Sequence, residues 1–172
     1  GHLEVVKYLV EQRGADVEVK DDYGRTPLHT ASEKNKVEVV KYLIEERHAN
    51  AEAINSDGST LLHVASEKGS IEVVKYLIKE CNANVEAQDN KGMTPLQIAS
   101  WKGQMEVISY LFEEHHANIE AKDNDERTLL HFASSKGKIE VVKYLIEQCH
   151  ANVEAQDSKG MTPLHIVSDN GK

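Results

Sequence analysis

The chain repeats itself every 34 residues, and this period constrains the fold more than any other feature of the sequence. Tyrosine and leucine recur at this spacing, at Tyr8, Tyr42, Tyr76, Tyr110 and Tyr144 and at Leu28, Leu62, Leu96, Leu130 and Leu164. A fixed period of this length is typical of a stack of supersecondary units, each of which buries its apolar face against its neighbours. We therefore expect a single domain over residues 1–172 that divides as follows: half repeat 1–20, full repeats 21–54, 55–88, 89–122 and 123–156, and half repeat 157–172.

The first part of each repeat carries the signals of a short helix. In the repeat 89–122, Thr94 can cap the helix and Pro95 stands at the first helical position, where its missing N–H costs nothing. Gly103 then suits the left-handed residue that ends a helix. The same role is expected at the matching positions, Asn35, Gly69, Gly137 and Gly171. In the turn before the helix, Glu126 replaces a glycine, so that turn must be strained or change its shape.

The second part of each repeat predicts another helix and a short arm. Residues 37–44 place valine, leucine and isoleucine on one wide face and leave Glu38 and Lys41 outside it. The stretches 83–87 and 151–155 alternate apolar and polar residues, which favours an extended arm. Together these signals predict an all-α solenoid of stacked helix-turn-helix units, joined by short turn or hairpin loops.

The sequence also has a longer period of 68 residues, which spans two of the 34-residue repeats. The repeat 55–88 matches 123–156 at 24 of 34 positions, but it matches its neighbour 89–122 at only 16. We infer that a pair of repeats was the unit duplicated. The alternation either shapes a surface pattern or records a recent duplication with no function attached.

The repeat resembles the ankyrin repeat in its turn and in both helices. The residues that carry the resemblance are Asp21-Asp-Tyr-Gly-Arg-Thr-Pro-Leu-His29, Ala31-Ser32 and Val37-Glu-Val-Val-Lys-Tyr-Leu43. The motif recurs in register along the whole chain, with one residue more per repeat than is usual in that family. The tetratricopeptide repeat shares the period, but its Trp-x-x-Leu-Gly-x-x-Tyr signature is missing. The resemblance implies a protein-binding solenoid.

Four of the nine histidines occupy one slot of the repeat, the last place of Thr-x-Leu-His. They are His29, His63, His131 and His165, and Gln97 fills the slot in the remaining copy. An imidazole one turn from the N-cap can hydrogen-bond the threonine hydroxyl or nearby backbone groups, and a glutamine amide can do the same. We therefore expect a structural role for this slot, as the family resemblance also implies.

Apart from His2, the other histidines gather with the two cysteines in two columns after the second helix. One column holds His48, His116 and His150, and the other holds Cys81, His115 and Cys149. A zinc ion needs its ligand atoms within about 2.0–2.3 Å, whereas packed helices of neighbouring repeats lie roughly 8–10 Å apart. The same spacing places a disulfide out of reach. We expect free thiols, no metal and no cofactor.

Charge and motif content exclude several classes of function. With 29 acidic and 20 basic side chains the formal net charge is -9 at pH 7, which opposes binding to nucleic acid and to anionic membranes. No apolar run is long enough to span a membrane, and two cysteines suit a reducing compartment, so we expect a cytoplasmic protein. Phosphate-loop, Gly-x-Ser-x-Gly and His-Glu-x-x-His motifs are missing, so we expect no enzyme and no catalytic residue.

The positions that differ between repeats are free to recognise a partner. They are the turn tips and the exposed side of the first helix, which usually line the concave recognition surface in the ankyrin family. We call these positions the tip-and-helix surface. Its candidate partner-binding residues are Tyr23, Arg25, Glu33, Asp57, Glu67, Lys91, Met93, Trp101, Lys102, Asp125, Arg127, Lys159 and Met161.

Trp101 is the best candidate for an anchor on this surface. It is the only tryptophan and stands where other repeats carry Glu33, Glu67 or Ser135. Tryptophan is enriched at interface hot spots. The alternative is that Trp101 packs on its own turn or on a neighbouring repeat. We expect a protein-recognition module, and the alternative is a non-catalytic spacer or regulatory array within a larger enzyme or channel.

Both ends of the chain divide a repeat. Residues 1–20 hold a second helix without its first, and residues 157–172 hold a first helix without its second. We therefore expect a fragment of a longer array. The two halves are complementary, which predicts head-to-tail self-association of a kind that does not close.

Overall fold

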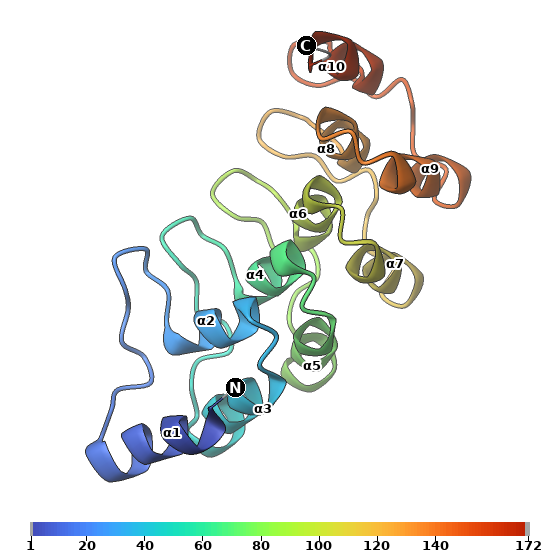
Figure 1. Ribbon diagram of the computed structural model, residues 1–172. Coiled ribbons are helices and arrows are strands. Elements are labelled where there is room, and N and C mark those ends of the chain that lie inside the picture. Colours follow the sequence, from blue (N-terminus) through green and yellow to red (C-terminus); the bar gives the residue numbers. More distant parts are fainter. Residues whose placement is uncertain (1, 171–172) are drawn as a thin grey trace. The chain divides into compact units, whose positions relative to one another are not determined.

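A computed structural model describes residues 2–170 of the chain as helices joined by turns (Figure 1). The helical segments, in order, are α1 (Leu3–Lys7), η1 (Tyr8–Gln12), α2 (Pro27–Glu33), α3 (Val37–Lys41), η2 (Tyr42–Glu46), α4 (Leu61–Lys68), α5 (Ile71–Cys81), α6 (Pro95–Lys102), α7 (Met105–Glu113), α8 (Leu129–Ser135), α9 (Ile139–Glu147) and α10 (Pro163–Asn170). Within residues 2–170 there is no β-strand, and a single isolated bridge joins Ile54 to Thr60. The all-α prediction is confirmed.

The chain forms two compact units, Gly1–Asn84 and Val85–Lys172, which we call the N-terminal unit and the C-terminal unit. In the N-terminal unit, α2 packs beside α4 and α3 packs beside α5, while η1 and η2 continue α1 and α3 as wider π-helical turns. In the C-terminal unit, α6, α8 and α10 form one row of first helices, and α7 and α9 pair with α6 and α8 (Figure 1). The single domain with its repeat limits stays a prediction.

Each first helix begins at the predicted threonine cap. In α4, the Thr60 N–H donates to His63 Nδ1 at 3.2 Å, and Thr60 Oγ1 lies 2.8 Å from the same nitrogen. In α6, the Thr94 N–H donates to Gln97 Oε1 at 2.8 Å. The structural role of the slot is confirmed, with the same bond in the remaining copies at His29, His131 and His165.

The same slot also ties one repeat to the next, which the sequence did not predict. His131 Nε2 lies 3.0 Å from the carbonyl oxygen of Met161, in the following turn. Gln97 Nε2 donates to the carbonyls of Ala121 and Arg127 at 2.9 and 3.0 Å. Because both ends of His131 and of Gln97 are engaged, these two side chains position the tip of the following repeat as well as capping their own helices.

The recurring leucines form the core between first helices. Leu28, Leu62, Leu96 and Leu130 are only 1–2% exposed, whereas Leu164 of α10 is 73% exposed. Full burial of a leucine contributes about 1.5–3 kcal/mol. Within each unit, the repeats are therefore stabilised by their neighbours, as expected for a solenoid.

Left-handed residues end both helices of a repeat. Asn35, Gly69, Gly103 and Gly137 have φ between 52° and 82°, as predicted, and the expected cap at Gly171 lies outside the described residues, as does Gly1. After the second helices, the left-handed residues are His48, Asn82, His116 and His150, with φ between 51° and 55°. The histidine column therefore occupies a backbone position that histidine tolerates better than most residues.

The arms after the second helices are turns, so the prediction of extended segments is wrong. In one arm the Glu120 N–H donates to Asn118 Oδ1 at 3.0 Å, and the Asn118 N–H donates to Glu86 Oε1 of the preceding arm at 2.8 Å. The alternation arises because asparagine closes the turn and glutamate bridges to the next arm, while Ala117 is buried. Glu52, in the same position of its arm, likewise donates its N–H to Asn50 Oδ1.

Glu126 adopts the strained alternative for its turn. Its φ is 60°, and its N–H donates to the Asp123 carbonyl at 2.9 Å. Gly24 makes the same bond to Asp21 at 2.9 Å. The turn therefore keeps its shape at the expense of a left-handed backbone, which costs about 1–2 kcal/mol for a residue with a Cβ.

Candidate partner-binding surface

Each tip of the tip-and-helix surface is closed by an aspartate or an asparagine. Asp89 Oδ1 accepts from the N–H groups of Lys91 and Met93 at 2.8 and 2.9 Å. The same side-chain closure occurs at Asp21, Asn55, Asp123 and Asp157. Because the backbone of the tip is satisfied from within, the side chains between these bonds are not needed for the fold.

Successive tips within a unit are also bonded to one another. The Ser56 N–H donates to the Tyr23 carbonyl at 3.0 Å in the N-terminal unit. In the C-terminal unit the Asn124 N–H donates to the Lys91 carbonyl at 3.0 Å, and the Ser158 N–H donates to the Asp125 carbonyl at 2.9 Å. The backbone bonds hold the variable side chains of neighbouring repeats in fixed register.

The candidate residues differ in how far they reach the surface. Tyr23, Asp57, Lys91, Asp125 and Lys159 are exposed; Arg25, Glu33, Glu67, Trp101, Lys102, Arg127 and Met161 are half-buried; Met93 is buried. The structure thus places only the middle residues of the tips outermost, while the last residue of a tip is as buried as the helix residues or more so. Met93 contributes to the packing beneath the surface and offers little area to a partner.

In the N-terminal unit, Glu33 lies among three basic side chains. It ion-pairs with Arg25 at 3.4 Å, with Lys34 at 3.1 Å and with Lys68 at 4.0 Å, and its side chain is only 16% exposed. The hydrogen bond from Lys34 lowers the pKa of the Glu33 carboxyl, so it stays ionised. Lys68 also pairs with Glu67 at 3.8 Å. This part of the surface is a network of neutralised charges.

In the C-terminal unit, Trp101 packs against an apolar cluster. The members of this cluster are Met93, Ile98 and Phe132. Trp101 therefore packs on the neighbouring repeat and keeps part of its side chain exposed, while its role as an anchor stays a prediction. The Lys102 and Lys136 ammonium groups lie 4.3 and 5.2 Å from the ring centroid, within range of cation–π attraction.

Phe132 is a surface-supporting residue that sequence reasoning missed. It belongs to the repeat after Trp101, and the Arg127 guanidinium lies 5.1 Å from its ring. Arg127 also binds Asp123 at 2.6 Å and Asp125 at 3.0 Å. The available signal was that this position varies between repeats, with Val64 and Ile98 at the matching places.

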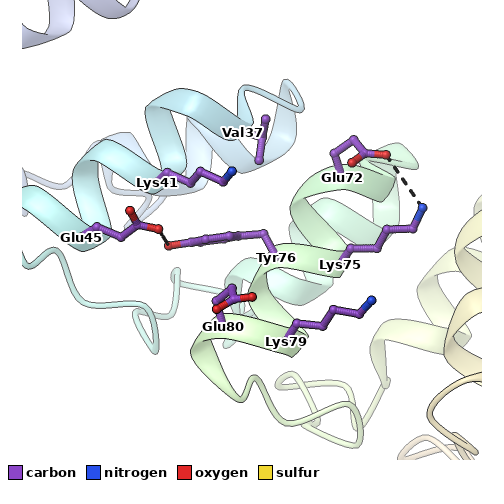
Figure 2. Close-up of a pocket in the computed structure, with 8 residues that line it drawn as sticks. All are labelled: Val37, Lys41, Glu45, Glu72, Lys75, Tyr76, Lys79 and Glu80. Atoms are coloured by element: carbon purple, nitrogen blue, oxygen red, sulfur yellow. Dashed lines mark hydrogen bonds and ion pairs between the residues drawn. The ribbon is translucent and has the colours of Figure 1, made fainter.

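A groove of about 300 Å³ lies on the other side of the N-terminal unit, between the second helices. Figure 2 shows Glu45 of η2 meeting the hydroxyl of Tyr76 of α5, which donates to it at 2.9 Å. The residues that line the groove are Val37, Lys41, Glu45, Glu72, Lys75, Tyr76, Lys79 and Glu80. Lysines and glutamates alternate along it, so it selects for neither sign of charge.

The two cysteines are free thiols. Burial raises the pKa of Cys81 and raises that of Cys149 to about 11, so both stay protonated near neutral pH. Within residues 2–170, no group of three or more histidine, cysteine, aspartate or glutamate side chains is placed to hold a metal ion. No helix in this part of the chain has the length and apolarity needed to cross a membrane.

Comparison with known families supports the architecture described above. The family model of ankyrin repeats, which spans several repeats at a time, matches residues 1–55, 47–123 and 115–172. These three matches together cover the chain from end to end. A comparison with curated proteins found no match. Repeats of this family are generally protein-interaction modules and are typically non-catalytic. With its stacked helix pairs, threonine caps and bonded tips, the chain belongs to the ankyrin-repeat family.

Proposed function

We propose that the chain is a non-catalytic module that binds a partner protein through its tip-and-helix surface. One observation carries this proposal: the tip backbones are satisfied by constant aspartate, asparagine and backbone bonds, while the side chains between those bonds vary. Evolution can change such side chains without unfolding the repeat, and a partner can read them. We further propose a cytoplasmic location, which the two free thiols support.

The proposal is tested by selecting binders from a display library of natural protein segments. A tip variant carries Tyr23→Ala, Lys91→Ala and Asp125→Ala, all at exposed positions. A control variant carries Lys79→Ala and Glu80→Ala, which are exposed on α5 beside the groove of Figure 2. We expect the selected segments to lose roughly tenfold or more in affinity for the tip variant and to bind the control normally.

The same experiment can contradict the proposed function. Segments that bind the tip variant and the wild type equally would place recognition elsewhere on the chain. A selection that yields no segment above background would favour the spacer or regulatory array instead. Thermal melting of both variants checks that the substitutions leave the fold intact.

We also propose that copies of the chain associate head to tail. Tyr8 is 55% exposed, although Tyr42 at the matching position is 2% exposed, and Leu164 is exposed where its internal equivalents are buried. An apolar groove of about 390 Å³ is lined by Val6 and Leu43 at the first end of the array, and another of about 290 Å³ is lined by Leu130 and Leu164 at the last. Residues 157–170 of one copy and 1–20 of another together supply one 34-residue repeat.

Light scattering over a range of protein concentrations measures this association. We expect the apparent mass to rise with concentration for the wild type and to stay monomeric for Leu164→Asp. Lys79→Asp, on the outer face of α5, serves as a control for added negative charge. A wild type that stays monomeric at all concentrations would contradict the proposal.

A further inference from the structure

The side chain of Trp101 is partly exposed, and its ring lies beneath basic side chains from two successive repeats. Lys102 belongs to the same helix, whereas Lys136 follows α8 in the next repeat, and both ammonium groups lie over the ring. The ring also rests on the apolar cluster. Lys138 adds a third basic side chain beside the residue that ends α6. An aromatic surface and a group of cations therefore occur together.

In the N-terminal unit, the matching lysines face a carboxylate instead of an aromatic ring. Glu33 stands where Trp101 stands, and Lys34 binds it at 3.1 Å. In the next repeat Lys68 binds Glu67 at 3.8 Å. The repeat scaffold is the same in both units, so the local charge differs because tryptophan replaces glutamate in this column.

The carboxylates of the neighbouring tip do not neutralise Lys136. Asp123 and Asp125 are bound by Arg127, at 2.6 and 3.0 Å. Lys136 makes no ion pair with a carboxylate anywhere in residues 2–170, and its side chain is exposed. A carboxylate brought by a partner could therefore reach this ammonium without displacing one of the chain's own.

We propose that the C-terminal unit binds an acidic protein segment that also carries an apolar side chain, a proposal that rests on the function proposed above. The carboxylates of the segment accept hydrogen bonds from the ammonium group of Lys136 and lie beside that of Lys102. Its apolar side chain lies on the exposed part of the indole ring of Trp101. Charge-assisted bonds beside an aromatic anchor are the combination typical of interface hot spots.

A protein segment fits this surface better than a nucleic acid does. The chain as a whole carries a net charge of -9, which repels a polyphosphate backbone at long range. A short acidic peptide has fewer charges and can place them beside the lysines alone. The apolar ring also offers contact area that a peptide side chain can cover.

Trp101 is the only tryptophan, so its fluorescence reports directly on this site. The probe is a short synthetic peptide of glutamate and leucine, compared with counterparts in which glutamine or lysine replaces glutamate. The test variant is Lys102→Glu with Lys136→Glu. The matched control is Lys34→Glu with Lys68→Glu, which makes the same charge change in the same columns of the N-terminal unit.

We expect the acidic peptide to change Trp101 emission and to bind at least about tenfold more tightly than the glutamine peptide. The test variant should lose at least about tenfold in affinity, and the control should change by less than about twofold. A variant with Lys102→Arg and Lys136→Arg should retain binding, which separates loss of charge from loss of folding. Equal affinity for the acidic and glutamine peptides would overturn the proposal.

Quenching of Trp101 in the unbound protein gives a second readout. Iodide should quench the tryptophan more strongly than caesium, because the local charge is positive although the net charge is negative. The test variant should reverse this order, while quenching by neutral acrylamide should change little. Stronger quenching by caesium in the wild type would contradict the proposed charge of the site.

Failure of this proposal can be told apart from failure of the proposed function. Neutral or basic segments selected by display, and unaffected by the test variant, would overturn the acidic partner and leave protein recognition standing. If a single-stranded DNA oligonucleotide bound tightly to the wild type and not to the test variant, the two lysines would bind nucleic acid and not an acidic protein segment. A display selection without binders would remove the proposed function itself.

Discussion

The two units of the chain have the same repeat but present different surfaces. In the N-terminal unit, Glu33 lies among Arg25, Lys34 and Lys68, and the charges cancel. In the C-terminal unit, Trp101 stands in that column and two lysine ammonium groups lie over its ring. The first surface is polar and neutralised, whereas the second is aromatic and basic.

The difference teaches which positions the ankyrin repeat leaves open to change. Tip bonds at Asp21 and Asp89 have the same pattern and nearly the same lengths in the two units. The threonine caps at Thr60 and Thr94 also match, although one bonds a histidine and the other a glutamine. The scaffold does not depend on the side chain in the column of Glu33 and Trp101. Exchange of this one side chain is therefore sufficient to change the charge of the surface.

The largest effect is expected from truncation of a core leucine, which tests whether the two units have equally well packed cores. Leu62→Ala in the N-terminal unit and Leu130→Ala in the C-terminal unit should each lower the free energy of unfolding by about 3 kcal/mol, because both leave a cavity. Leu164→Ala, at the matching exposed position, should change it by less than about 0.5 kcal/mol. Urea unfolding measures all three. A much smaller loss for Leu62→Ala would mean that the units differ in packing as well as in surface.

The next largest effect is expected from substitutions at Trp101 and Glu33, which compare the contribution of packing with that of charge. Trp101→Ala should lower the free energy of unfolding by about 1–2 kcal/mol, because the ring covers the apolar cluster. Glu33→Ala should lower it by less than about 1 kcal/mol, because its ion pairs lie near solvent. High salt should shrink only the second loss, since screening acts on ion pairs and not on packing. A Trp101→Ala variant as stable as the wild type would show that the tryptophan serves binding alone.

Much of the scaffold could be predicted because its causes are local. The threonine cap with His63 and the left-handed ends at Gly69 and Gly103 each involve residues a few positions apart. The 34-residue period then repeats each local solution along the chain. The candidate tip residues followed from the same register, since residues that vary at a fixed position are not required by the scaffold.

The rest depends on contacts between successive repeats, which the register alone does not resolve. Lys136 reaches the ring of Trp101 from the next repeat, and Phe132 supports that ring from below. The arms were predicted as extended because alternation is a strand signal, but Asn118 closes a turn there. Lys136 and Phe132 each contact a residue of another repeat, whereas the turn at Asn118 is closed within its own repeat by a bond that the alternation did not reveal.

A pH effect distinguishes one repeat of each unit at the slot after the cap. His29 fills it in the repeat 21–54 and Gln97 in the repeat 89–122, and both are buried. Burial lowers the pKa of His29 below its ordinary value of 6.5, although the Ser59 carbonyl opposes the shift. The unfolded chain therefore takes up the proton first, and His29 contributes stability that is present above pH 6.5 and lost as the pH falls below it.

The test is His29→Gln, which copies the residue of the repeat 89–122. We expect this variant to lose less stability than the wild type between neutral and mildly acidic pH, because a glutamine amide does not take up a proton in this range. Gln97→His should add a dependence of the same sign. Unfolding in urea at several pH values measures both. An unchanged pH dependence in His29→Gln would mean that His29 titrates alike in the folded and unfolded chains.

The smallest effect concerns a strained tip of the C-terminal unit. Glu126 has a φ of 60° where the preceding tip has Gly92 at 75°. Its ion pair with Lys122, 3.3 Å long, joins exposed side chains and contributes little. In Glu126→Gly, relief of about 1–2 kcal/mol of left-handed strain outweighs about 0.5–1 kcal/mol of added chain entropy. The net gain should be about 0.5–1 kcal/mol, measured as a higher melting temperature.

The reverse change at the preceding tip supplies the control. Gly92→Ala should destabilise the chain, because its φ is positive and a Cβ there would lie 2.8 Å from the Asn124 backbone nitrogen. The two variants separate strain at one residue from a general preference for glycine in tips. If Glu126→Gly also lowered the melting temperature, the glutamate would be stabilising its tip through contacts that exceed the strain. The C-terminal unit would then differ from the N-terminal unit in its scaffold as well as in its surface.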